Sequence, residues 1–200
     1  FNDFEIIIVN DGSSDQTAAI ATAAGAAVLR APLPQGAWGA MQTGIRYAVR
    51  AGYPCVVTMD ADGQHEPAYL EQLLKAGETA DVVIGACPAR GSRLRRFAWA
   101  YFRFLTGFNF EDLTSGFRYY NSSACRQLAV EEATLLDYQD VGVLLLLHKT
   151  GFRIREVAVV INPRQAGASR VFDSWLTVAR YMAETTLLCM ARWKIRPPRP

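Results

Sequence analysis

The sequence predicts an α/β domain with a Rossmann-like, mainly parallel sheet flanked by helices. Through residue 86, short apolar runs alternate with segments of helical periodicity, which is the pattern of β-α-β units with parallel strands. The chain has 200 residues, and half of them are apolar. That is enough for one well-packed core, and it excludes a disordered chain.

Each predicted element is an apolar run or an amphipathic stretch with turn residues at its ends. Strands are predicted near residues 5–10, 26–30, 55–59, 81–86, 117–121 and 153–161. Helices are predicted at residues 15–24, 38–51, 67–77, 93–106, 122–130, 138–150 and 173–192. Pro67 suits the first position of its helix, and Gly151 follows the helix that ends at Thr150.

Two carboxylates spaced one residue apart, Asp60 and Asp62, directly follow the apolar run 55–59. Ligands of α/β sheets bind where the strands end. Carboxylate oxygens are suitable ligands for Mg²⁺ or Mn²⁺, and such an ion usually keeps coordination positions for water and for the oxygens of a diphosphate. A solvated Asp-Gly turn is the alternative for this segment. A calcium loop of the helix-loop-helix kind fits poorly, because His65 stands where the sharp turn requires glycine.

A second acidic turn follows the first predicted strand at Asp11. If both strands lie in one parallel sheet, Asp11 and the Asp60/Asp62 pair reach the same edge. The alternative is that Asp11 is a turn residue bonded to its own backbone.

Four motifs in this order resemble family-2 nucleotide-sugar glycosyltransferases with the GT-A fold. They are Val-Asn-Asp-Gly-Ser-Ser-Asp (9–15), Asp-Ala-Asp-Gly-Gln-His (60–65), Asp-Leu-Thr-Ser-Gly-Phe-Arg (112–118) and Arg-x-x-Gly-x-Ser-Arg (164–170). Within the family, the chain is most similar to the dolichol-phosphate mannose synthase and bacterial polyprenyl-phosphate glycosyltransferase branch. The resemblance covers nearly the whole chain.

The resemblance implies an inverting transfer of a sugar from a nucleotide diphosphate to a polyprenyl phosphate, and a smaller acceptor half after the nucleotide half. It implies a metal held by Asp60 and Asp62. The residues expected to bind substrate are Asp11, Asp60, Gln64, Ser169 and Arg170, and those expected to be catalytic are Asp140, Arg118 and Arg164.

Arginine is suited to the acceptor side because its planar fork grips a phosphate without losing charge. An ionised phosphate attacks a sugar carbon without a base, and Asp140 is then a helix N-cap or an arginine partner. A saccharide acceptor requires a base, for which Asp140 is the best candidate. The alternative for Arg118 and Arg164 is that they solvate surfaces or pair with Asp112 and Glu156.

Two departures from the family pattern stand out. The family's first strand and its turn do not precede Phe1, so the chain resembles one that lacks this strand. Trp38 stands in the small-residue turn 36–40, where it either packs against the nucleotide or marks a shifted turn. Both departures motivate a third function besides the two transferases, namely an inactive nucleotide-sugar-binding remnant.

Composition and charge bear on what the protein binds and on the compartment in which it works. A formal net charge of +2 does not indicate nucleic-acid binding, and the four cysteines have no metal-ligand spacing, which fits a reducing cytoplasm. His65 is expected to be a solvated turn residue and His148 a structural one.

The predicted domains are 1–172, the catalytic unit, and 173–200, an amphipathic helix with a basic tail. This helix resembles an interfacial helix on an anionic membrane, so the protein is expected at the inner face of the membrane. A helix packed on the protein's own core is the alternative.

Overall fold

The computed structural model describes residues 4–90, 93–135, 140–162 and 175–193. Its strands are β1 (Ile7–Asn10), β2 (Ala27–Arg30), β3 (Cys55–Thr58), β4 (Val82–Ala86), β5 (Arg118–Asn121) and β6 (Ile154–Ala158). Its α-helices are α1 (Thr17–Ala23), α2 (Gly36–Ala51), α3 (Leu70–Gly77), α4 (Arg93–Thr106), α5 (Ser122–Ala129), α6 (Val141–Lys149) and α7 (Trp175–Trp193). The alternating order predicted from the sequence is confirmed, with boundaries shifted by a few residues.

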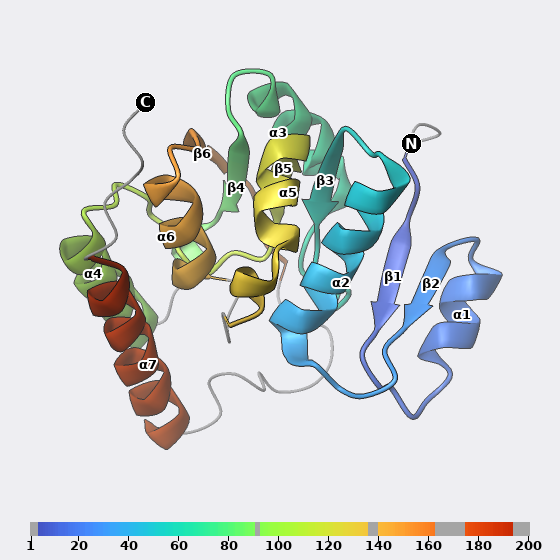
Figure 1. Ribbon diagram of the computed structural model, residues 1–200, viewed down its shortest axis with the longest axis horizontal. Coiled ribbons are helices and arrows are strands. Elements are labelled where there is room, and N and C mark those ends of the chain that lie inside the picture. Colours follow the sequence, from blue (N-terminus) through green and yellow to red (C-terminus); the bar gives the residue numbers. More distant parts are fainter. Residues whose placement is uncertain (1–3, 91–92, 136–139, 163–174, 194–200) are drawn as a thin grey trace.

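The strands form a parallel pair, β1–β2, and a four-stranded sheet of order β3-β5-β4-β6. In the larger sheet β3, β4 and β6 share one direction, and only β5 runs against its neighbours. Figure 1 shows β1, β3 and β4 pointing the same way. The α/β fold with mainly one strand direction is therefore confirmed.

The expectation that the first strand and the strand at 55–59 belong to one sheet is wrong for the described residues. β1 and β3 lie in separate hydrogen-bonded sheets, and α2 packs against both. Apolar runs predict that strands exist, whereas backbone hydrogen bonds between distant segments decide which strands pair. β5 takes the place beside β3, between it and β4.

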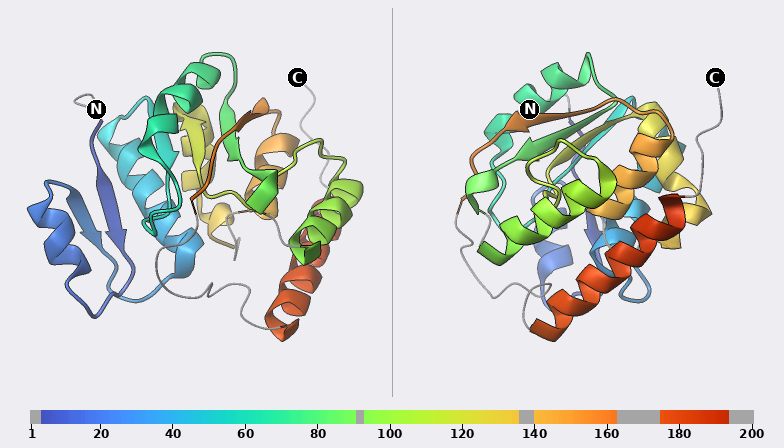
Figure 2. Two further views of the ribbon diagram at one scale, coloured as in Figure 1. Left: turned by 180° about the vertical axis from the view of Figure 1, so that it is seen from behind. Right: turned by 90° about the vertical axis from the view of Figure 1, so that its left-hand side faces the viewer.

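Helices cover both faces of the larger sheet (Figures 1 and 2). Alternate residues of β4 point to opposite faces: Val82 packs in a core formed with α2, α5 and α6, and Val83 packs against Leu73 of α3. A third cluster joins Ile84 to residues of α4, α6 and α7. Strand β4 is thus buried on both faces, as its apolar sequence predicts.

Trp38 belongs to the first of these cores, which speaks against packing on the nucleotide, and residues 36–40 lie in α2 rather than in a turn. Its side chain is 3% exposed, and its Nε1 donates a hydrogen bond to the Ala133 carbonyl at 2.7 Å. The ring fills space between α2 and the segment after α5. Packing in the core therefore accounts for a tryptophan at this position of α2.

Helix α7 lies beside α4, and its inner face is buried (Figure 1). Tyr181, Thr185 and Cys189 are each less than 5% exposed, so the alternative of a helix packed on the protein's own core holds for this face. In the described part of the chain, no helix is both long enough and apolar enough to cross a membrane. The domain boundary at residues 172–173 lies outside the described residues.

Candidate active site

The acidic turn after β3 is ordered by its own hydrogen bonds. The Asp60 N–H donates to His65 Nδ1 at 3.1 Å, and the Gln64 N–H donates to Asp62 Oδ1 at 3.1 Å. The local bonding is that of an Asx-type turn. The Asp60 side chain nevertheless remains 46% exposed, so its carboxylate is accessible to a ligand.

His65 is buried, and the expectation of a solvated turn residue is wrong. The residue is 5% exposed, and its ring stacks on Phe117 with centroids 5.2 Å apart. Its Nδ1 faces the Asp60 backbone N–H at 3.1 Å and lies 4.0 Å from the Asp60 carboxylate. Phe117 is distant in the sequence, and no local signal indicates this stacking.

The acidic turn is bonded to the segment that leads toward Arg164. His65 and Ile161 form an antiparallel bridge, and the Asn162 N–H donates to the Gln64 carbonyl at 2.9 Å. The Gln64 side chain donates to the Asn162 carbonyl at 3.2 Å, and the Asn162 side chain donates to Glu66 at 2.7 Å. Sequence reasoning missed Asn162, which joins two of the motifs. The predicted residues Arg164, Ser169 and Arg170 lie outside the described residues.

Asp11 holds the beginning of α2. Its two carboxylate oxygens accept the N–H groups of Gln35 at 2.6 Å and of Gly36 at 2.8 Å. Helix N-termini have unpaired N–H groups and a positive dipole end, so a carboxylate stabilises them. Asp11 thus binds a distant backbone rather than its own turn. Its expected contact with substrate stays a prediction.

Arg118 and Asp140 lie inside the protein. Arg118 is 1% exposed, and its Nη2 donates to the Leu113 carbonyl at 3.0 Å. The Asp140 carboxylate accepts the Val141 N–H at 2.7 Å and the Tyr181 hydroxyl at 2.6 Å. Burial raises the pKa of Asp140, and the Tyr181 hydrogen bond and the Arg118 charge oppose that rise. Asp140 therefore has the contacts of a helix cap with an arginine nearby.

The two acids weighed as arginine partners bind backbone groups. Glu156 accepts the N–H groups of Glu111 and Asp112, at 2.8–2.9 Å. Asp112, which is fully buried, accepts the N–H groups of Cys87 and Thr114. These bonds order the segment that enters β5, and so they help to position Arg118.

Residues 1–133 match the family model described as Glycosyl transferase family 2. The chain belongs to glycosyltransferase family 2. It is 31% identical to the undecaprenyl-phosphate mannosyltransferase of Micrococcus luteus, over 84% of this chain and 75% of that protein. It is 29% identical to the polyprenol monophosphomannose synthase of Mycolicibacterium smegmatis, over 96% of this chain and 76% of that protein.

Solved structures support the fold of this glycosyltransferase. Glucosyl-3-phosphoglycerate synthase from Mycobacterium tuberculosis, in complex with Mn²⁺, UDP and phosphoglyceric acid, superposes with a TM-score of 0.66. The match covers 98% of this chain and 69% of that one, at 21% sequence identity. At this identity, the likeness shows a shared fold and nothing finer.

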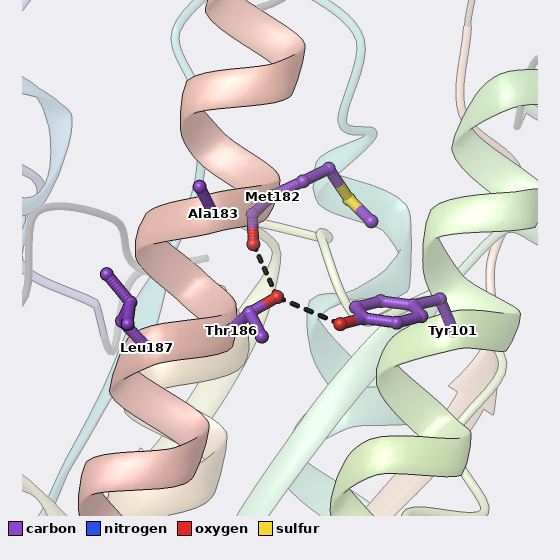
Figure 3. Close-up of a pocket in the computed structure, with 5 residues that line it drawn as sticks. All are labelled: Tyr101, Met182, Ala183, Thr186 and Leu187. Carbon is purple, nitrogen blue, oxygen red and sulfur yellow. Dashed lines mark hydrogen bonds between the residues drawn. The ribbon is translucent and has the colours of Figure 1, made fainter.

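A second surface of this glycosyltransferase lies between α4 and α7. An open hollow of about 410 Å³ is lined by Tyr101, Met182, Ala183, Thr186 and Leu187 (Figure 3). The Tyr101 hydroxyl and Thr186 Oγ1 are hydrogen-bonded at 3.1 Å across the two helices. Four large apolar side chains of the same two helices are exposed. They are Phe97, Phe104, Leu187 and Met190, which we call the α4–α7 face.

Proposed function

We propose that this enzyme transfers a sugar, with inversion, from a nucleotide diphosphate to a polyprenyl phosphate at the inner face of the cytoplasmic membrane. The observation that carries the proposal is the hydrogen bonding of the acidic turn to Asn162, two residues before Arg164. These hydrogen bonds connect the acidic turn, which we expect to bind the diphosphate, to the segment that leads to Arg164. Arginine is suited to binding an acceptor phosphate. The printed names of the two relatives support the acceptor class, and they make mannose the first donor sugar to test.

A divalent cation, Mg²⁺ or Mn²⁺, fits the acidic turn. Asp60 and Asp62 offer hard carboxylate oxygens in a partly exposed turn, which suits such an ion. Among the described residues, no three His, Cys, Asp or Glu side chains cluster as a closed metal site. Asp60 and Asp62 would hold such an ion, and diphosphate oxygens and water would supply its other ligands. When bound, it neutralises charge on the departing diphosphate.

The protein's own groups do the rest of the chemistry. The acceptor phosphate is already ionised near neutral pH, so it needs positioning and charge neutralisation rather than a base. In this proposal Arg164 provides that charge, and Asp140 holds the buried Arg118 instead of removing a proton. The contacts of Asp140 with the start of α6 and with Tyr181 support this role. Since Trp38 lies in the core, it no longer motivates an inactive remnant.

Transfer of radiolabelled mannose from GDP-mannose to a short polyprenyl phosphate, followed into the organic phase, tests the function directly. A panel of UDP- and GDP-sugars extends the test to other donors. Label that moves only to an added saccharide would favour the saccharide acceptor. Absence of transfer from every donor, with either acceptor, would contradict the transferase proposal.

Replacement of Arg164 with Lys should lower kcat/KM for the lipid phosphate. Lysine keeps the charge but loses the bidentate fork, and a charged hydrogen bond is worth about 1.5–3 kcal/mol, or roughly 10- to 100-fold. Steady-state kinetics measure the effect, and calorimetry should show nearly unchanged nucleotide-sugar affinity. Arg126→Lys on the exposed side of α5 is the matched control. A loss confined to donor affinity would place Arg164 at the nucleotide.

The α4–α7 face is the proposed contact with the membrane. Phe104 is 89% exposed, and α4 carries Arg93, Arg95, Arg96 and Arg103 with no acidic residue. Exposed apolar side chains with basic neighbours suit the surface of an anionic bilayer.

Phe104→Ser should weaken binding to anionic phospholipid vesicles by roughly tenfold or more, because a buried Phe contributes about 1.5–3 kcal/mol. Vesicle cosedimentation measures this binding. The matched control is Ile20→Ser, since Ile20 is 65% exposed on α1, on the opposite side of the molecule (Figure 1). Equal binding by both variants would contradict the contact.

A further inference from the structure

Helix α7 reaches into the buried cluster around Asp140. Tyr181, Thr185 and Cys189 lie one turn apart on the inner face of the helix. The Tyr181 hydroxyl donates to Asp140 Oδ2 at 2.6 Å, while Asp140 Oδ1 accepts the Val141 N–H at 2.7 Å. Each carboxylate oxygen is therefore held by a different helix, one by α6 and the other by α7.

The Tyr181 ring is itself fixed in place. It makes an edge contact with Phe102 of α4, with ring centroids 6.0 Å apart, and Thr185 hydrogen-bonds its hydroxyl from the next turn of α7. The 2.6 Å distance to Asp140 is that of a short O–H···O hydrogen bond. The Arg118 charge lowers the pKa of Asp140, so the two groups interact electrostatically, and a buried guanidinium needs a negative charge nearby.

We propose that Tyr181 is a positioning residue of the transfer reaction, whose hydroxyl holds the Asp140 carboxylate toward Arg118 and makes α7 a working part of the site. The inference rests on the proposed function, because it takes Arg118 and Asp140 as groups on the acceptor side. The sequence alone suggests a membrane-surface helix or a helix packed on the core, and neither alternative includes a part in the reaction. In this proposal the inner face of α7, with the buried Tyr181, contacts Asp140, and the outer face, with the exposed Leu187, contacts the membrane.

Asp140 is the carboxyl group of this contact, and burial raises its pKa. The neighbours whose charges or hydrogen bonds interact with it are Arg118 of β5, Val141 of α6, and Tyr181 and Cys189 of α7. Arginine stays charged throughout. Burial raises the pKa of Tyr181 well above its usual value, and it raises that of Cys189 to about 11, so both stay neutral. The charge of Lys149 on α6 opposes the rise of the Cys189 pKa.

Tyr181→Phe removes one hydroxyl and keeps the ring. We expect kcat for lipid-phosphate glycosylation to fall roughly 10- to 100-fold, the value of a hydrogen bond to a charged group, with KM for the nucleotide sugar unchanged. In an Asp140→Asn background the same replacement should change kcat by less than about threefold, because the two groups act as one unit. Tyr119→Phe, which alters a tyrosine buried on the opposite face of the sheet, is the matched control.

Unfolding at two pH values tests the contact without any activity. The Tyr181 hydrogen bond lowers the pKa of Asp140, so Tyr181→Phe raises that pKa further above its unfolded value. A carboxyl group whose folded pKa is raised loses its stabilising contribution as pH rises. The urea midpoint of Tyr181→Phe should therefore fall further below wild type at neutral pH than at acidic pH, whereas Tyr119→Phe shows an equal difference at both.

The outcomes separate this inference from the function on which it rests. Wild-type protein that transfers no sugar, combined with the pH-dependent stability difference, would contradict the proposed function and leave the Tyr181–Asp140 contact supported. Active wild type with Tyr181→Phe kinetics equal to those of Tyr119→Phe would overturn the positioning role. A fall in kcat that is just as large in the Asp140→Asn background would also overturn it, because Tyr181 would then act without Asp140.

Discussion

Sugar transfer should fall by at least roughly 10²- to 10³-fold in the Asp62→Asn enzyme, since a bound metal contributes several kcal/mol to stabilising a leaving diphosphate. Asparagine keeps an oxygen that can accept the Gln64 N–H, so the turn keeps its shape while the negative charge is lost. Mn²⁺-dependent binding of a nucleoside diphosphate, followed by calorimetry, should disappear with the activity. Circular dichroism should show an unchanged fold.

The control for Asp62→Asn is Glu71→Gln, which removes an exposed carboxylate from the first turn of α3. Its activity should equal that of wild type. Excess EDTA should reproduce the loss in the wild-type enzyme. Full turnover by Asp62→Asn, or by wild type in EDTA, would show that the acidic turn has no metal-binding role in the reaction.

Trp38→Ala should lower the free energy of unfolding by about 3–5 kcal/mol, the usual cost of truncating a buried aromatic side chain. The change leaves a cavity in the core between α2 and α5, and it removes the donor to the Ala133 carbonyl. Urea denaturation followed by circular dichroism measures the loss.

Trp38→Phe separates the ring from its hydrogen bond. It should cost less than Trp38→Ala, because most of the apolar volume remains while the Ala133 carbonyl loses its partner. Both variants should bind nucleotide sugar normally wherever they are folded. A Trp38→Ala protein of unchanged stability that fails to bind the nucleotide would instead place Trp38 at the donor site.

The order of elements and the positions of the acidic turns were predictable because they depend on local patterns. The apolar run of β3 ends just before Asp60 and Asp62, and the alternation of apolar runs with amphipathic stretches predicts the helices between strands. Those signals lie within one element or its immediate flank. The order of the four motifs along the chain provided the resemblance to the family.

Contacts between distant segments were not predictable in this way. The sequence shows a histidine in a polar turn at His65, but its burial depends on Phe117 of the segment entering β5. In the sequence, Trp38 departs from the small residues expected at this position. The structure shows that its indole N–H donates a hydrogen bond to the Ala133 carbonyl. In each case the deciding partner is far along the chain.

The sequence by itself determined the family, the α/β character and the residue types that could hold a metal and a phosphate. Only the tertiary structure decided that β5 lies between β3 and β4, and that Asp140 is held by Tyr181. It also decided that the inner face of α7 belongs to the core. The physical reason is that periodicity reports which face of an element is apolar, whereas burial and hydrogen bonding depend on which other element covers that face.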